Sequence, residues 1–440
     1  MRTSKRMRLV ALTASVLVAA AACGSSDGGG SGGETTGAAG GSTGGSTGEG
    51  TGGNAAPEVD PLKLGYVLPE TGDLAYLGPP QIQAMKFAIK QINDSGGVLG
   101  KQIPAPVGGD EANDQAIASQ SADRVLNSGV QGLIGAAASG MSLAIIDKVT
   151  GAQVAQCSGS NTAPTFTGYD DGGFYIRTAP SDALQGPVLA DVVTGDGHSK
   201  IAIIARADDY GKGLAAATKK SLENGGAEVV LDDTYDPKAT NFDATVQKIA
   251  AAKPDAVVII AFEEGKQIIK GLIETGMTPK DTGFYGADGL RSADLAKLVD
   301  PKDPGVLAGM KGTAPASADN PKFTKALKAF APKLKELQFA PQVYDCVNVI
   351  ALAAEKSKST TAADFKAAFN EVTEGGEKCN DFASCKKLLD AGKDVDYDGA
   401  SGPLDFTDVG EPGKATIEVY GYNAKGKLET LDTRQSVPLK

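Results

Sequence analysis

Two loops rich in small polar residues follow apolar runs of strand length in the first half of the chain. Ser139 comes after GLIGAAA and before an apolar helical pattern, and the stretch SGSNT at 158–162 follows GAQVAQC. Hydroxyl groups and unpaired backbone N–H groups at the start of a helix suit a carboxylate ligand. Ordinary capping of a strand-to-helix loop explains either loop alone equally well. Because the two loops occur together, they form a candidate carboxylate site.

Three later strand ends carry aromatic or acidic residues, namely Tyr210, Phe262 and Asp288. An anion at a helix N-terminus gains only about 0.3 to 2 kcal/mol, whereas an enclosed charge without a partner costs several, so an enclosed ammonium group needs a carboxylate. Asp288 is the candidate, with aromatic faces adding cation–π attraction. Ala-Asp-Gly is also common turn chemistry. The two groups together would suit a small zwitterion with an apolar side chain.

Apolar runs of strand length alternate with helical patterns from about residue 61 onward. The expected strands are 62–68, 132–137, 152–157, 201–206, 228–231, 256–262 and 283–287, with closing strands in PLDFTD and KATIEVYGYNAKGKLETL. The expected helices are 82–92, one from about 142, 212–223, 241–252, 265–276, 321–335, 341–357 and 362–371. Continuous Val, Ile and Ala strands separated by helices predict doubly wound α/β structure with parallel sheets covered on both faces.

About 380 residues follow the N-terminal region, which is more than one core usually holds. The alternation pauses at 177–185 and at 309–317, and a third crossing fits near Gly402. We therefore expect two Rossmann-like lobes joined by three hinge crossings. Lobe 1 comprises 58–180 and 313–403, and lobe 2 comprises 181–312 and 404–440. Ligands of open parallel sheets bind beyond the C-terminal strand ends, so the cleft between the lobes is the expected site.

The N-terminal region is typical of an exported, anchored protein. Residues 1–22 have a basic start and a short apolar run, which predicts a signal peptide. Cys23 follows Ala20, Ala21 and Ala22 and resembles the lipidated cysteine of a bacterial lipobox, although Ala20 stands where Leu is usual. Residues 23–57 read as a lipidated Cys followed by a disordered Gly/Ser/Thr tether. We expect attachment to the outer face of the cell membrane; ordinary secretion with a spare thiol is the alternative.

The charged residues and the single histidine argue against several classes of function. The net charge is −11 with scattered Lys and Arg, which does not indicate a nucleic-acid partner. His198 is the only histidine and no CxxC occurs, so neither a metal nor another cofactor is expected. His198 lies in GDGHSK with no Gly-x-Ser-x-Gly elbow nearby, which argues against a Ser-His-Asp hydrolase. We therefore expect binding without catalysis.

Four cysteines remain beyond Cys23, namely Cys157, Cys346, Cys379 and Cys385. Exported chains meet oxidising surroundings, so two disulfides are plausible and three pairings are possible. Their closeness in sequence favours Cys379 with Cys385, which leaves Cys157 to pair with Cys346. Two buried free thiols are the alternative.

Several blocks of the sequence resemble a known family. They include ETGDLAYLGPPQIQAMKFAIKQINDSGGVLGKQI, GLIGAAASGMS, SGSNTAPTFT, YIRTAPSDALQGPVLADV, KIAIIARADDYGKGLAAA and PDAVVIIAFEEGKQIIKGLIETGM. They look like successive blocks of the leucine-isoleucine-valine-binding proteins, branched-chain amino-acid receptors of ABC importers with the type I periplasmic-binding-protein fold. The resemblance runs from about residue 62 to the C-terminus, in order and with matching spacing.

The resemblance implies a division of the ligand site between the lobes. The carboxylate-binding Ser and Thr of the family fall on Ser139 and Thr162, with backbone groups near Ala137 and Ser160.

In the second lobe the resemblance implies further site residues. The ammonium-binding Glu falls on Asp288, and cleft aromatics fall on Tyr210 and Phe262. Another family aromatic falls on Leu77. The shorter Asp288 and the aliphatic Leu77 put leucine itself in doubt more than an amino acid in general.

The expected function is therefore capture of a small amino acid, branched-chain or otherwise apolar, in the interlobe cleft by a monomer that delivers it to the permease of an ABC importer. A sensor with the same fold, or a receptor for a short amide or small carboxylate, is the alternative. Sequence alone leaves the identity of the ligand open.

Overall fold

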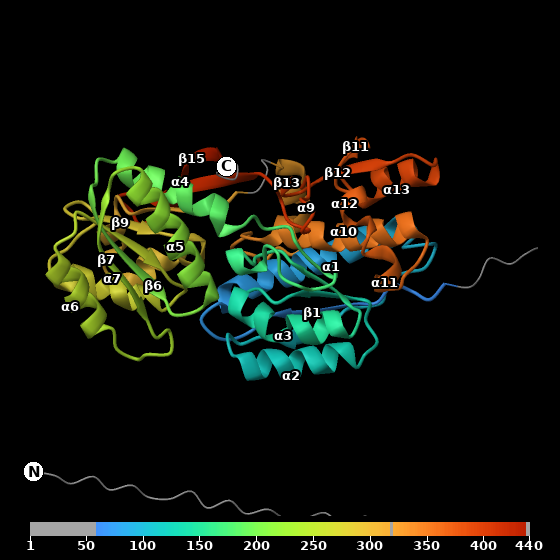
Figure 1. Cartoon of the computed structure of the whole chain (residues 1–440), viewed down its shortest axis with the longest axis horizontal. Helices are drawn as coiled ribbons and strands as arrows, with labels where there is room; N and C mark the ends of the chain where they lie inside the picture. Colours follow the sequence, from blue (N-terminus) through green and yellow to red (C-terminus); the bar gives the residue numbers. More distant parts are fainter. Residues whose placement is uncertain (1–58, 317–319, 437–440) are drawn as a thin grey trace, which may run out of the picture. The chain divides into compact units, whose positions relative to one another are not determined.

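The computed structural model of the chain describes residues 59–316 and 320–436. The expected signal peptide (1–22), Cys23 and the tether (23–57) lie outside these residues. Within them the chain forms two α/β lobes, each around its own mainly or wholly parallel sheet (Figure 1). None of the helices in this part of the chain combines the length and apolar character needed to cross a membrane.

The first lobe is built on a five-stranded sheet in which every neighbouring pair is parallel. The strands in spatial order are β2 (Val107–Asp110), β1 (Leu64–Leu68), β3 (Gly132–Gly135), β4 (Ala155–Ser158) and β5 (Tyr175–Arg177). Helices α1 (Gly78–Asp94) and α10 (Ala340–Ser357) pack together on one face, and α2 (Gln115–Leu126) and α3 (Ser139–Gly151) on the other (Figure 1). All of β1 is buried, as a central parallel strand requires.

The second lobe is built on a seven-stranded sheet with an antiparallel edge. In spatial order the strands are β15 (Leu428–Ser436), β14 (Ala415–Tyr422), β10 (Lys311–Pro315), β9 (Gly283–Gly286), β8 (Ala256–Ile260), β6 (Lys200–Arg206) and β7 (Glu228–Tyr235). Two pairs of helices pack on it, α4 (Asp182–Gly195) with α5 (Asp209–Asn224) and α6 (Asp243–Ala252) with α7 (Gly265–Glu274).

Smaller elements complete the described structure. They are η1 (Ala75–Leu77), η2 (Pro164–Phe166), η3 (Asp288–Leu290), η4 (Pro304–Leu307), α8 (Leu295–Val299), α9 (Pro321–Phe330), α11 (Ala362–Phe365), α12 (Ala368–Glu371) and α13 (Phe382–Asp390), with a small sheet of β11 (Glu377–Cys379), β12 (Val395–Gly399) and β13 (Gly402–Pro403).

Two sequence expectations about secondary structure differ from the structure in detail. The stretch at 309–317, expected as a crossing, also contains β10, which pairs with β9 and β14 in the second sheet, so the crossing begins only after Pro315. The stretch PLDFTD, expected as a closing strand, contributes only Pro403 to β13. The rest of that stretch leads into a loop that contacts β5, where Arg177 N donates to Gly410 O. The apolar Leu404 and Phe406 in it are buried by this packing, which explains the misleading pattern.

The chain passes between the two main sheets after β5, after β10 and after β13. The expected lobe boundary at 180 lies just before α4. The expected boundary between 312 and 313 falls inside β10, which belongs to the second sheet throughout. Residues 404–414 separate β13 from β14.

The buried apolar core is continuous between the lobes. One cluster of buried residues contains Leu77 and Val343 of the first lobe together with Tyr210 and Phe262 of the second. Separating the lobes would therefore expose apolar surface at a cost of about 25 cal/mol per Å².

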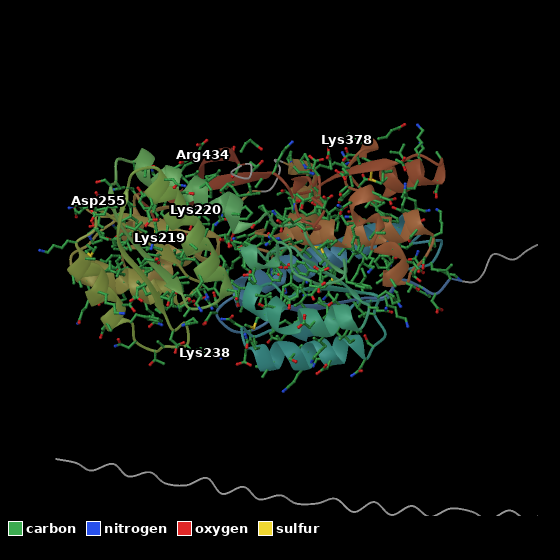
Figure 2. The ribbon with its side chains drawn as sticks, viewed as in Figure 1. Lys219, Lys220, Lys238, Asp255, Lys378 and Arg434 are labelled. Atoms are coloured by element: carbon green, nitrogen blue, oxygen red, sulfur yellow. A yellow bond between two sulfur atoms is a disulfide. The ribbon has the colours of Figure 1, made fainter. Side chains whose placement is uncertain are left out.

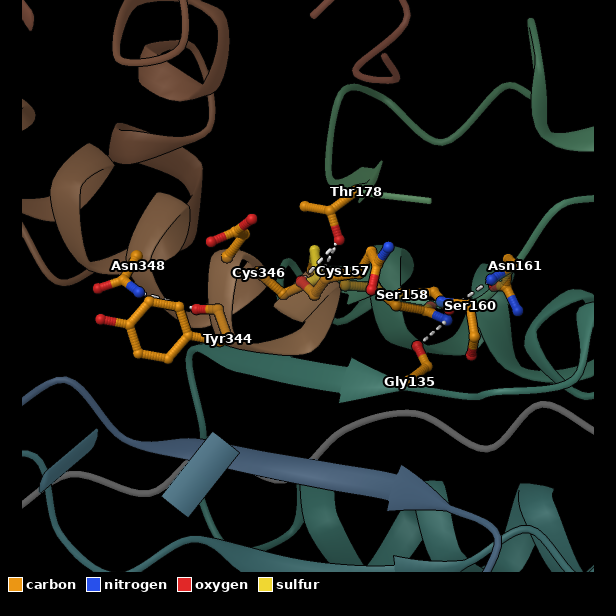
Figure 3. The surroundings of a disulfide bond; sticks show 12 residues. Gly135, Cys157, Ser158, Ser160, Asn161, Thr178, Tyr344, Cys346 and Asn348 are labelled. Atoms are coloured by element: carbon orange, nitrogen blue, oxygen red, sulfur yellow. Dashed lines mark hydrogen bonds between the residues drawn. A yellow bond between two sulfur atoms is a disulfide. The ribbon is translucent and has the colours of Figure 1, made fainter. Parts of the chain in front are cut away.

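The described residues contain two disulfides, in the pairing that the sequence favours. Cys157 at the end of β4 is bonded to Cys346 in α10, and Cys379 to Cys385. Figure 3 shows the first bond beside Thr178, whose hydroxyl donates to Gln342 O at 2.7 Å. This bond therefore fixes the start of the 158–162 loop to a helix from a distant part of the sequence.

We expect the double substitution Cys157→Ser with Cys346→Ser to lower the free energy of unfolding more than Cys379→Ser with Cys385→Ser. The bonded cysteines are 189 and 6 residues apart, respectively. Loop-closure entropy then predicts losses of about 5 and about 2 kcal/mol. Urea unfolding of the two purified variants measures both values. Equal losses, or a larger loss for the shorter loop, would contradict this account.

Candidate functional site

Residues from the C-terminal strand ends of both lobes enclose a small cavity. Its walls are Leu74, Leu77, Ala137, Ala138, Ser139, Ser160, Tyr210, Phe262, Asp288, Gly289 and Phe339. The space that the centre of a water molecule can occupy is about 10 Å³, room for roughly one water. The cavity as it stands therefore has no room for a solute of amino-acid size. A larger hollow behind the hinge is lined by Thr178 after β5 and Ala316 after β10, but by none of the eight expected ligand residues. The hollow beside β5 is likewise lined by none of them.

The structure brings seven of the eight expected ligand residues to this cavity. They are Leu77, Ala137, Ser139, Ser160, Tyr210, Phe262 and Asp288. The eighth, Thr162, does not line the cavity and is almost fully buried. Leu77, which directly precedes α1, is buried in the wall of the cavity.

The backbone of the first loop is not free, contrary to the sequence expectation. Ala137 N and Ala138 N donate to the two carboxylate oxygens of Glu111, at 2.6 and 3.0 Å. Glu111 is fully buried, and burial raises its pKa to about 8 although the two N–H groups lower it. Glu111 follows β2, and an acidic residue after a strand gives no sequence signal of this contact. An internal carboxylate thus takes two of the donors predicted for a ligand.

Ser139 starts α3 directly after these alanines. Its Oγ accepts a hydrogen bond from Ala163 N at 3.3 Å. The hydroxyl proton therefore remains available for an acceptor in the cavity, as a carboxylate site requires.

The 158–162 loop is clamped onto the first loop by its polar side chains. Ser158 Oγ donates to Ala136 O at 2.8 Å and accepts from Asn161 N at 3.1 Å. Asn161 Nδ2 donates to Ala137 O at 2.9 Å. Ser160 Oγ also lies 3.1 Å from that carbonyl. Ser158 and Asn161 therefore shape the loop, and Figure 3 shows them extending from the disulfide.

Thr162 and Asp182 meet where the chain leaves the first lobe. Asp182 N donates to Thr162 O at 2.7 Å. Both side chains are buried, and the Thr162 hydroxyl lowers the pKa of Asp182 by hydrogen bonding to it. Among the described residues, no other group hydrogen-bonds to Thr162 Oγ1 or to the carboxyl oxygens of Asp182. Sequence reasoning missed Asp182 because an acid in the first turn of a helix is ordinary.

Asp288 is held by groups of the second lobe. Its Oδ1 accepts from Gln185 Nε2 and from Tyr210 OH, both at 2.9 Å. Tyr210 OH in turn accepts from Gly289 N at 3.2 Å. Asp288 is buried, and burial raises its pKa, whereas these hydrogen bonds lower it. The expected acidic group therefore lies at the cavity, oriented by an amide and a phenol.

Tyr210 and Phe262 form an aromatic wall. Their rings are stacked with centroids 5.3 Å apart and an interplanar angle of 17°. The Arg206 guanidinium carbon lies over the Phe262 ring, 3.5 Å from its centroid, and forms a cation–π interaction with it. Arg206 also pairs with Asp208 and, at 2.8 Å, with Glu264. Its charge is therefore balanced within the second lobe.

Residues that sequence reasoning did not assign join the lobes across the cavity. Tyr76 OH donates to Gly289 O at 2.7 Å, and Gln338 Nε2 donates to Asp288 O at 2.8 Å. Phe339 lines the cavity with a φ of 60°. Lys238 and Asp114 form an exposed ion pair at 3.2 Å between the lobes. These contacts join segments far apart in sequence.

The described residues contain no group of three or more His, Cys, Asp or Glu side chains placed to hold a metal ion. The lining of the cavity combines hydroxyls, one carboxyl group and apolar surface. Such a lining can bind and orient a small polar solute.

Comparison with known proteins agrees with this geometry. The family model described as "Periplasmic binding protein" matches residues 61–427. The leucine-, isoleucine-, valine-, threonine- and alanine-binding protein of Pseudomonas aeruginosa is 28% identical over 304 residues, 68% of this chain and 79% of the relative. Members of this family are non-enzymatic solute-binding proteins, and the family implies an exported protein.

Solved structures share the fold. The branched-chain amino-acid transporter protein LivJ of Streptococcus pneumoniae, in complex with isoleucine, has a TM-score of 0.70 at 22% identity, covering 86% of this chain and 100% of that chain. A solute-binding protein from R. palustris, in complex with 4-hydroxybenzoate, has a TM-score of 0.70 at 18% identity, covering 86% and 98%. The match over residues 61–427, together with the two-lobed architecture, shows that the chain belongs to the periplasmic binding protein family.

Proposed function

We propose that this chain captures a small amino acid with an apolar side chain in its interlobe cavity and delivers it to an ABC permease. The observation that carries the proposal is the position of Asp288, a buried carboxyl on the second lobe that shares one cavity with Ser139 of the first. A carboxyl group and a hydroxyl on opposing walls complement the two ends of a zwitterion.

Each part of such a ligand has a complementary surface. The carboxylate would lie at the start of α3, where Ser139 can donate and where the helix N-terminus favours negative charge. The ammonium would lie at Asp288 and the face of Tyr210. The apolar side chain would pack on Leu74, Leu77 and Phe339.

Glu111 changes the expected role of the first loop. Because its carboxylate accepts from Ala137 N and Ala138 N, these donors are not available to the ligand. Glu111 instead holds the loop in place beside the cavity. In the proposal, Ala137 and Ser160 therefore form part of the cavity wall. The carboxylate of the ligand is bound by hydroxyl groups and not by these backbone N–H groups.

Closure would follow from contacts made only when the lobes meet. Tyr76 with Gly289, and Gln338 with Asp288, are such contacts. A ligand that bridges the walls adds to them and shifts the population towards the closed form. The closed form is then the species that the permease recognises.

The acidic wall favours an amino acid over a simple carboxylate. The related solved structures include one with isoleucine and one with 4-hydroxybenzoate, so the fold by itself does not select the ligand. A carboxylate without an ammonium group would face Asp288 without charge compensation. Native mass spectrometry for a co-purified ligand, followed by calorimetry with the twenty amino acids, short amides and benzoates, tests this. Binding of benzoates alone would overturn the proposal.

We also propose that the protein acts as a monomer anchored by a lipid on Cys23. The leader and the tether that follow from the sequence would place the folded body close to the permease. Mass spectrometry of the membrane fraction would show a diacylglyceryl modification on the processed N-terminal cysteine. An unmodified protein in the culture medium would favour ordinary secretion instead.

We expect Asp288→Asn to weaken binding of the amino acid at least about thirtyfold, because removing one partner of a buried charge pair costs 2 to 5 kcal/mol. Isothermal titration calorimetry measures the loss. The matched control is Asp255→Asn in the same lobe. Asp255 directly precedes β8 and therefore lies at the end of this strand opposite to Phe262. Figure 2 places Asp255 away from the first lobe. Unchanged affinity in Asp288→Asn would rule out the ammonium assignment.

We expect Tyr76→Phe to weaken ligand binding about fivefold, because it removes one hydrogen bond of about 1 kcal/mol between the lobes. Tyr285→Phe is the control, since Tyr285 OH donates to Asp196 within the second lobe at 2.7 Å. Calorimetry gives the two affinities, and small-angle scattering of ligand-bound protein gives the degree of closure. Equal affinity of the two variants would show that the Tyr76 contact does not contribute to closure.

A further inference from the structure

Arg177, the last residue of β5, is a fully buried cation. A guanidinium group carries five N–H donors, and its three nitrogens make five hydrogen bonds here. Nη1 donates to Asn161 O at 3.3 Å and to Ala163 O at 2.8 Å. Nε donates to Glu411 at 2.8 Å, and Nη2 donates to Glu411 and, at 3.1 Å, to Thr167 Oγ1. The side chain of Arg177 is therefore held in one orientation.

The charge of Arg177 is balanced by Glu411, which lies in the 404–414 crossing between the lobes. Both side chains are buried, so removing one of them would leave the other charge without compensation. The Thr167 hydroxyl lies between the two groups and donates to the carboxyl oxygens of Glu411, at 2.9 and 3.1 Å. Glu411 therefore determines where the guanidinium of Arg177 lies.

The backbone of the 404–414 crossing is also fixed to β5. Arg177 N donates to Gly410 O at 3.0 Å, directly before Glu411 in the chain. Gly410 has a φ of 70°, and a Cβ at this position would lie only 2.8 Å from Ile176 Cγ2. Glycine permits both this conformation and this close approach. The crossing therefore contacts β5 through its backbone as well as through the side chain of Glu411.

Ala163 connects Arg177 with the hydroxyl group of Ser139. The carbonyl of Ala163 accepts from Arg177, and its N–H donates to Ser139 Oγ at 3.3 Å. Because this N–H occupies one lone pair of the oxygen, the Ser139 hydroxyl is left to donate to a group in the cavity that it lines. A distance of 3.3 Å is at the long end for such a bond, so a small displacement of Ala163 would break it. The position of Ala163 therefore influences the orientation of the Ser139 hydroxyl.

We propose that Arg177, anchored by Glu411, is a positioning residue for ligand binding: it holds Ala163 in the place that directs the Ser139 hydroxyl into the cavity. The inference deepens the proposed function and rests on it, since it requires that Ser139 binds the ligand. Arg177 itself does not line the cavity and acts through Ala163. The orientation of a ligand-binding hydroxyl thus depends on an ion pair with the crossing between the lobes.

Glu355 provides a matched control, because an ion pair that only stabilised the first lobe would not affect Ser139. The side chain of Glu355 is also buried, accepts from Leu99 N at 2.7 Å and pairs with Lys386 at 3.2 Å. It lies near the C-terminal end of α10, whereas Phe339 at the other end of this helix lines the cavity. Glu355→Gln therefore removes a buried charge from the same lobe at a distance from the ligand site.

Amide hydrogen exchange of the purified, ligand-free protein tests the contact with Ala163. In Glu411→Gln we expect the peptides that cover residues 159–167 to exchange at least about tenfold faster than in the wild type, because Ala163 loses its fixed place. In Glu355→Gln these peptides should exchange as in the wild type. Mass spectrometry measures the exchange, and urea unfolding measures the stability that each variant loses. Equal exchange of these peptides in the two variants would overturn the inference.

Arg177→Lys is the second variant, and it decides the question if Glu411→Gln does not fold. Lysine keeps the positive charge beside Glu411 but has three donors on a single nitrogen, so it cannot bond the carboxylate and both backbone carbonyls in the geometry of arginine. We expect faster exchange of residues 159–167 in this variant as well. Exchange identical to that of the wild type would overturn the role of the guanidinium.

A double-mutant cycle with Ser139→Ala tests the link to the ligand. Thermal-shift screening of the twenty amino acids identifies one that binds, and calorimetry then measures its affinity. We expect Ser139→Ala to weaken binding at least about tenfold and Glu411→Gln about three- to tenfold. The double variant should match Ser139→Ala within about twofold, because Glu411 acts through Ser139. Losses that multiply in the double variant would overturn the inference and leave the proposed function standing.

The two proposals fail in different ways. A wild-type protein that binds none of the twenty amino acids would contradict the proposed function, and hydrogen exchange alone would then decide whether Arg177 holds Ala163 against Ser139. Glu355→Gln should bind the amino acid with the affinity of the wild type. An equal loss of affinity in Glu355→Gln and Glu411→Gln would show that Glu411 only stabilises the lobe, and would overturn the inference.

Discussion

The burial of acidic groups between two lobes is the constraint on which the site depends. Asp288 follows β9 and Asp182 begins α4, and both are enclosed at the edge where the parallel strands end. A charge enclosed in this way is stable only with a compensating partner. The neighbouring cation Arg177 is committed to Glu411. In the function that we propose, a positively charged group of the ligand is this partner.

The rest of the first lobe gives that site a fixed wall. Glu111 holds the loop before α3 through two backbone N–H groups, and Ser158 with Asn161 fastens the neighbouring loop to it. The bond from Cys157 to α10 fixes the strand that carries this second loop. The N–H donors that the sequence suggested for the ligand thus maintain the wall itself.

Members of this fold hold different solutes with the same architecture. The structures similar to this chain include complexes with isoleucine and with 4-hydroxybenzoate. Specificity must then reside in the few side chains at the strand ends. In this chain they are an aromatic stack, a buried carboxyl and the aliphatic Leu77. The resemblance to the leucine-isoleucine-valine-binding proteins implies that Asp288 stands where the family has a longer Glu and Leu77 where it has an aromatic residue.

The sequence by itself determined the α/β class, most of the strands and helices, the positions of Ser139 and Asp288 at strand ends, and the favoured cysteine pairing. These depend on local periodicity and on residues that directly follow a strand. Only the tertiary structure decided that β10 belongs to the second sheet, that Glu111 takes the N–H groups of Ala137 and Ala138, and that Asp182 N donates to Thr162 O. Each of these is a contact between segments distant in sequence, and hydrogen bonding and burial at such contacts depend on how the elements pack, which no local pattern records.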